Sequence, residues 1–142
     1  MKRILVGVDG SKEARVAEAQ AAELASSMGG RLVIACAVPP TVTTEGAPEL
    51  IARAQELEAL EAEQATEITR KAAEGIARPG LDVETRVISG SPATALAELA
   101  RTEDFDLIVV GHRGRGTLSR VLLGSVADRL VQIATKPVLV AR

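Results

Sequence analysis

The sequence predicts an α/β protein with a doubly wound, open parallel sheet of five strands and helices on both faces. Five short apolar runs, rich in β-branched residues, alternate along the chain with four segments of helical periodicity. Glycine or proline lies at most of the junctions between them. The 142 residues are 46% hydrophobic, enough for one compact core. We therefore expect a single domain over residues 1–142.

The first strand is expected at residues 3–8, a near-continuous apolar run typical of a buried parallel strand. It ends in Asp9, Gly10 and Ser11, which are residues of turns and helix N-caps. Apolar residues then recur at helical spacing until Gly29-Gly30, where we expect left-handed backbone to end the helix. The predicted buried face consists of Ala14, Ala17, Ala21, Leu24, Ala25 and Met28.

The second strand is expected at residues 32–38, before Pro39-Pro40. Residues 49–78 have the pattern of a long amphipathic helix with a charged outer face. Its predicted apolar stripe contains Ala54, Leu57, Ile68, Ala72 and Ile76. Residues 81–87 alternate apolar and polar side chains, which predicts a half-exposed strand at an edge of the sheet.

The third helix is expected to begin at Pro92, with Ser91 as its N-cap. Its predicted inner face is Ala93, Leu96, Leu99 and Ala100. A fourth strand follows at residues 105–110, and the last strand is expected at residues 137–141. The helix between these strands is predicted to turn Val126, Leu130, Val131 and Ala134 inward.

Residues 111–125, GHRGRGTLSRVLLGS, connect the fourth strand to the last helix and contain four glycines. Ser125 and Asp128 match a capping box, which predicts that a helix begins near Ser125. Glycines let a ligand approach the backbone, and the first N–H groups of a helix favour an anion. The segment is therefore interpreted as a phosphate-binding turn. The alternative is that the glycines only permit a tight turn and close packing of a helix on the sheet.

The spacing of Gly111, Gly114, Gly124 and Ser125 resembles the nucleotide-binding signature G-x2-G-x9-G-[ST] of the universal stress protein family. The resemblance extends over the whole chain, from residues 4–11 to the closing strand at 136–140. It implies a Rossmann-like sheet of order 3-2-1-4-5. In such a sheet the carboxyl ends of strands one and four border one crevice, where ligands bind.

The resemblance also implies which residues bind ATP. Asp9 corresponds to an acid that contacts the nucleoside, and the backbone of Ala37 and Val38 corresponds to the adenine contacts. The glycines and Ser125 correspond to ribose and phosphate contacts. The complete candidate nucleotide site is Asp9, Gly10, Ser11, Ala37, Val38, Gly111, His112, Arg113, Gly114, Arg115, Gly124, Ser125 and Val126.

The resemblance favours a regulatory stress-response module that binds ATP and whose nucleotide state modulates the interaction with an unknown protein partner. Its Mg²⁺ would be held mainly by phosphate oxygens. The alternatives are an AMP or cyclic AMP binder, and an enzyme that uses an adenine nucleotide with His112 or Asp9 as a reacting group. Asp9 is equally typical of a turn that caps a helix. A lone histidine is a weak indication of acid–base catalysis, and no P-loop signature is present, so we expect at most slow hydrolysis.

Composition argues against several other classes of protein. The net charge is −2, aromatic residues make up 1% of the chain, and no long basic tract is present, so we expect no nucleic-acid partner. No apolar run approaches the length of a membrane span, and the first residues lack the pattern of a signal peptide. We therefore expect a cytoplasmic location without membrane contact. Cys36, the only cysteine, lies in an apolar run and is expected to be buried.

The two expected sheet edges predict a homodimer. The third strand carries Asp82, Glu84 and Arg86, charges that discourage association between edges. Residues 137–141 are apolar and uncharged, so two copies of this strand are expected to pair antiparallel around a twofold axis. The alternative is a monomer in which the last helix covers this strand.

Overall fold

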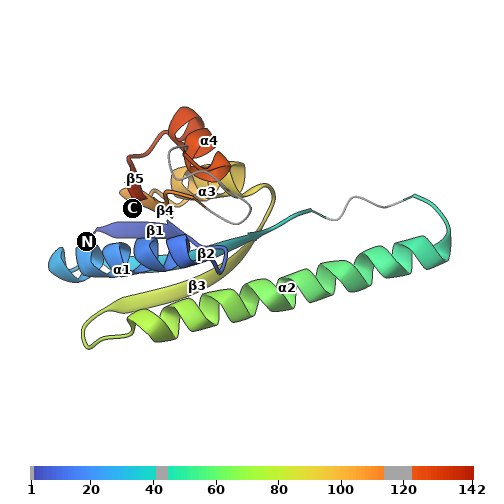
Figure 1. Ribbon diagram of the computed structural model, residues 1–142, viewed down its shortest axis with the longest axis horizontal. Coiled ribbons are helices and arrows are strands. Elements are labelled where there is room, and N and C mark those ends of the chain that lie inside the picture. Colours follow the sequence, from blue (N-terminus) through green and yellow to red (C-terminus); the bar gives the residue numbers. More distant parts are fainter. Residues whose placement is uncertain (1, 41–44, 114–122) are drawn as a thin grey trace.

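The computed structural model describes residues 2–40, 45–113 and 123–142, which form a parallel sheet with helices on both faces (Figure 1). The order of the five described strands is β3-β2-β1-β4-β5, which confirms the predicted fold. The strands are β1 (Arg3–Gly7), β2 (Arg31–Val38), β3 (Asp82–Ser89), β4 (Leu107–Gly111) and β5 (Val138–Ala141). The helices are α1 (Lys12–Ser27), α2 (Pro48–Ile76), α3 (Pro92–Thr102) and α4 (Ser125–Ile133).

Side chains alternate between two apolar layers along the central strands, as the twofold repeat of a β-strand requires. Ile4 and Val6 of β1 pack in one core together with α1 and α2. Leu5 of β1 packs in the other core with α3 and α4, where Phe105 is fully buried. The central strands are covered on both faces, which explains why their sequences are continuous apolar runs.

The order of the strands creates a switch point beside β1. The chain proceeds from β1 through β2 to β3 at one edge, then returns to the other side of β1 for β4 and β5. Val6 of β1 therefore has Ile34 of β2 on one side and Val109 of β4 on the other. The connections after β1 and β4 leave in opposite directions and open a crevice at the carboxyl ends of these strands.

The two edges of the sheet differ in charge, as predicted. The side chains of β3 are partly or fully exposed, and Arg86 donates two hydrogen bonds of 2.5 and 2.7 Å to the Glu103 carboxylate. At the opposite edge, β5 pairs with β4 and carries the half-buried residues Val138, Leu139 and Val140.

Several predicted helix details were correct and others were wrong. Gly29 has a φ of 61°, so α1 ends in left-handed backbone as expected. The capping-box prediction was wrong, because Gly124 is the N-cap of α4 and Ser125 is its first helical residue. Met28 and Val131, expected to be buried, are 45% and 48% exposed. Met28 caps the end of α1, and the buried residues of α4 are Ala127 and Leu130, so Val131 falls at the margin of that face.

The helix α2 packs on the sheet through its C-terminal half alone. Its buried residues are Ala65, Thr69, Ala72 and Ile76. Leu57, which the sequence pattern placed on the buried stripe, is 56% exposed, and that prediction was wrong.

None of the helices in the described part of the chain has the length and apolar character of a membrane span.

Candidate functional site

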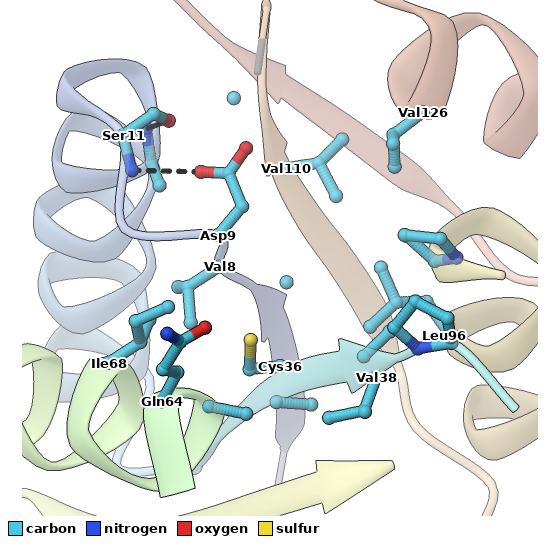
Figure 2. Close-up of a pocket in the computed structure, with 18 of the residues that line it drawn as sticks. Val8, Asp9, Ser11, Cys36, Val38, Gln64, Ile68, Leu96, Val110 and Val126 are labelled. Carbon is cyan, nitrogen blue, oxygen red and sulfur yellow. Dashed lines mark hydrogen bonds between the residues drawn. The ribbon is translucent and has the colours of Figure 1, made fainter. Parts of the chain in front are cut away.

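A cavity of about 330 Å³ opens where β1, β2 and β4 end (Figure 2). Its walls also include α2 and the first turns of α1, α3 and α4. The volume is near the lower end of the range for small-molecule pockets. Its position is the switch point that the strand order creates, where α/β proteins bind ligands.

One side of the cavity is apolar. Val8 directly follows β1, whereas Val38 extends from β2, Ile68 from α2 and Leu96 from α3, and all four border the same space (Figure 2). The buried thiol of Cys36 lies between them, as expected for a cysteine in an apolar strand. Such walls accommodate the faces of a flat aromatic ring.

Asp9 shapes the polar side of the cavity together with Ser11. The backbone N–H of Ser11 donates a 2.9 Å hydrogen bond to Oδ1 of Asp9, and Oγ of Ser11 accepts a 3.2 Å hydrogen bond from the N–H of Ala14. Ser11 is thus the N-cap of α1. Asp9 forms the turn before α1 and also lines the cavity, between Ser11 and Val110 (Figure 2). Both roles considered for Asp9 are therefore compatible with its position.

The first turn of α4 borders the cavity through Val126 and Ala127. Its N-cap is Gly124, which has no side chain to cap a helical N–H group. The first N–H groups of a helix have no partners within that helix, and they carry the positive end of the helix dipole. This end of the cavity is therefore suited to an anionic group.

Two of the predicted glycines have structural roles. A Cβ added to Gly111 would stand 2.8 Å from the carbonyl oxygen of Glu13, so glycine is needed for α1 to pack this closely. The N–H of Gly124 donates a 2.8 Å hydrogen bond to the carbonyl of His112. This bond holds the residue before α4 next to the residue after β4. The packing explanation considered for these glycines thus holds at Gly111.

His112 and Arg113 follow β4 but lie differently. A guanidinium nitrogen of Arg113 is 3.4 Å from Oε1 of Glu13, and Arg113 lines the cavity. His112 lines a second cavity of about 250 Å³ instead, with Val16 of α1 and Ala141 at the end of β5. The sequence interpretation treated His112 as part of one site with Asp9, and the structure separates them into two cavities.

A second carboxylate interacts electrostatically with Asp9. Glu18 of α1 is 8% exposed. Burial raises the pKa of its carboxyl, Arg15 lowers it, and the negative charge of Asp9 raises it. The net effect, chiefly from burial, raises the pKa of Glu18 and disfavours its ionisation. Among the described residues, no group of three or more His, Cys, Asp or Glu is placed to hold a metal ion.

The comparison with protein families gives a match over residues 1–142 to the model of the universal stress protein family. The chain belongs to the universal stress protein family. It is 34% identical to a universal stress protein of Methanocaldococcus jannaschii over 99% of this chain and 82% of that protein.

Solved universal stress proteins have the same fold. The UspA protein of Lactobacillus plantarum aligns with a TM-score of 0.87 at 28% identity, over 99% of this chain and 97% of that one. A universal stress protein solved in complex with cAMP has a TM-score of 0.73 at 30% identity, with coverage of 99% and 97%. One from Archaeoglobus fulgidus, solved in complex with dAMP, has a TM-score of 0.61 at 25% identity, with coverage of 100% and 98%.

Seven of the residues predicted for the nucleotide site line the first cavity of this universal stress protein. They are Asp9, Ser11, Ala37, Val38, Gly111, Arg113 and Val126. Gly10 and Ser125 lie next to lining residues without being part of the wall, Gly124 precedes Ser125, and His112 lines the second cavity. Gly114 and Arg115 lie outside the described residues.

The wall formed by α2 and α3 was missed in the sequence interpretation. It consists of Glu61, Gln64, Ala65, Ile68, Pro92 and Leu96. Ile68 was expected on the apolar stripe of its helix and Leu96 on the inner face of its helix. The helical pattern predicts which face of a helix is buried. It does not predict which residues of that face lie beside the carboxyl ends of the strands, so Ile68 and Leu96 were not assigned to the site.

Proposed function

We propose that this universal stress protein binds ATP in the cavity at the ends of β1, β2 and β4. The observation that carries the proposal is the cavity itself. It combines apolar walls at one side with the first turns of α1 and α4 at the other. An adenine nucleotide has a similar division, between a flat aromatic base whose faces pack on apolar side chains and an anionic chain of phosphates. The relatives solved with cAMP and dAMP support an adenine nucleotide as the ligand class.

In this proposal, the base occupies the apolar side, next to the backbone of Ala37 and Val38, and Asp9 faces the nucleoside. The phosphates extend toward Val126 and the first turn of α4, near Arg113. Gly114, Arg115, Gly124 and Ser125 are included because the family signature assigns phosphate contacts to this segment. ATP would bring Mg²⁺, which is commonly held by phosphate oxygens and water.

We further propose that the protein is a binding module in which the presence of the nucleotide alters the interaction with a protein partner. His112, a candidate reacting group, borders the second cavity, and Oδ1 of Asp9 accepts a hydrogen bond from Ser11. Neither arrangement favours rapid proton transfer to a ligand in the first cavity. We expect at most slow hydrolysis of ATP.

The test is calorimetric titration of the purified full chain with ATP, AMP, cyclic AMP and GTP, followed by an assay for released phosphate. The proposal predicts one adenine nucleotide per chain and weaker or no binding of GTP. Absence of adenine-nucleotide binding at millimolar ligand would refute nucleotide binding. Phosphate release at about 1 per second or faster, within the usual range of enzymes, would refute the binding-module assignment.

We also propose a homodimer formed through β5. This strand has β4 on one side, and its other side is the edge of the described sheet. An open edge of apolar residues is a template for pairing with another strand. Antiparallel pairing of two β5 strands would bury half-exposed Val138 and Val140 or Leu139 of each chain.

A further inference from the structure

The N-terminal half of α2 extends beyond the sheet. A helix of 29 residues is about 43 Å long. The eight-residue strands β2 and β3, on which it packs, span about 26 Å. The buried residues of α2 begin at Ala65, and Figure 1 shows the preceding turns projecting past the strands. The sheet is too short to cover the whole helix.

Leucines are exposed along this projecting half. Leu50, Leu57 and Leu60 are 57%, 56% and 49% exposed. Leu50 and Leu57 are seven residues apart and Leu60 follows by three, so all three lie on one face. That spacing is the a and d pattern of a helix that pairs with another helix. The face continues into Gln64 and Ile68, which line the first cavity. We name the side of residues 49–63 that carries these three leucines the projecting face.

The charges beside these leucines are almost all negative. Residues 45–63 contain six glutamates and one arginine. Glu49, Glu56 and Glu63 follow one another at seven-residue steps, directly before the a positions, where flanking charges select the partner helix. In the described ranges none of the six forms an ion pair, whereas Glu67 and Glu74 in the packed half both pair with Arg70.

We propose that the projecting face docks a helix of a partner protein that carries leucine-like residues at its a and d positions and lysine or arginine at the flanking positions. A second copy of α2 fits poorly, because its glutamates would meet those of the first copy. An anionic membrane would likewise be repelled by the glutamates. A basic helix covers the leucines and neutralises the glutamates together, and this inference does not depend on nucleotide binding.

The test uses two synthetic 21-residue peptides that differ in charge alone. Both have leucine at a and d, one has lysine and the other glutamate at the flanking positions, and each carries a fluorescent label. Fluorescence anisotropy on titration with the full chain should report binding of the lysine peptide, weakened by added salt. The glutamate peptide should bind at least about tenfold more weakly.

The matched variants separate the projecting face from the rest of the surface. Replacing Leu50, Leu57 and Leu60 together by Gln, which is a good helix former, should weaken binding of the lysine peptide by about tenfold or more. The control replaces Met28, at the end of α1, and Val131 of α4, both exposed apolar residues, by Gln and should leave binding unchanged. Circular dichroism verifies that both variants remain folded.

Three outcomes would overturn the proposal. The first is equal binding of the two peptides, and the second is unchanged binding to the folded leucine variant. The third is that the leucine variant abolishes self-association of the chain or binding to vesicles with anionic lipid, which would assign the face to a second copy or a membrane. These measurements do not depend on whether the first cavity binds a nucleotide.

Discussion

Gly111 at the end of β4 lies against the backbone of Glu13 in α1: a Cβ at residue 111 would stand 2.8 Å from the Glu13 carbonyl oxygen and 3.3 Å from the Ala14 nitrogen. Backbone atoms have little freedom to move, so Gly111→Ala forces α1 away from the sheet. We expect a loss of about 1–3 kcal/mol in the free energy of unfolding. Urea unfolding followed by circular dichroism measures it, and an unchanged midpoint would contradict the packing role.

Gly114 provides the contrasting variant. The family signature assigns this glycine to close approach of the phosphates, so Gly114→Val should weaken ATP binding by about tenfold or more while leaving the urea midpoint near that of the wild type. Calorimetry and urea unfolding of the same sample separate the two effects. Unchanged affinity in a well-folded variant would remove residue 114 from the phosphate site, and loss of folding would assign it to packing.

Much of the fold could be predicted because the signals are local. The alternation of apolar runs with helical patterns gave every described strand and helix, and the charges of Asp82, Glu84 and Arg86 marked β3 as an edge. The order 3-2-1-4-5 came from the family resemblance. Strand order depends on contacts between distant segments, and no local pattern encodes it.

The errors have physical causes of the same kind. Ser125 matched the N-cap of a capping box, but the N-cap is Gly124, one residue earlier, and Ser125 is the first helical residue. Leu57 has the spacing of the buried stripe, yet burial depends on whether the sheet extends that far. The part of the site formed by Gln64 and Ile68 was missed because the packing angle and length of α2 bring these residues to the strand ends.

Glu18 predicts a pH dependence of stability. Its pKa in the folded protein is raised, chiefly by burial, above its ordinary value near 4.5. For an acid with a raised pKa, the folded state holds the proton more strongly, so stability falls as the pH rises from the ordinary pKa through the folded one. Glu18→Gln removes this loss, so the variant should have the higher melting temperature at pH 7.

The control for Glu18 is Glu23→Gln, an exposed glutamate of the same helix. Melting temperatures of the three proteins at pH 4 and pH 7 give the result. The advantage of Glu18→Gln over the wild type should be larger at pH 7 than at pH 4, and Glu23→Gln should show little change. An advantage that shrinks toward pH 7 would mean that the carboxylate of Glu18 stabilises the fold.

The proposed dimer predicts a sedimentation result. At micromolar concentration the wild-type chain should sediment as a dimer, and Leu139→Lys with Val140→Pro should shift it toward monomer by placing a charge and a blocked N–H at the β5 edge. Val87→Lys, at the partly exposed β3 edge, serves as the control and should leave the dimer intact. A wild-type monomer, or a dimer that persists in the folded double variant, would rule out this interface.

The most direct test of the central claim fills the cavity. Ala37 is half-buried on β2 and lines the apolar side, whereas Ala73 is half-buried on α2 and is not among the lining residues. The measurement is calorimetric titration of ATP into Ala37→Phe and Ala73→Phe, with folding checked by circular dichroism. The account predicts that the affinity of Ala37→Phe for ATP is lower by about tenfold or more and that Ala73→Phe retains wild-type affinity. Wild-type affinity in a folded Ala37→Phe protein would contradict binding of the nucleotide in this cavity.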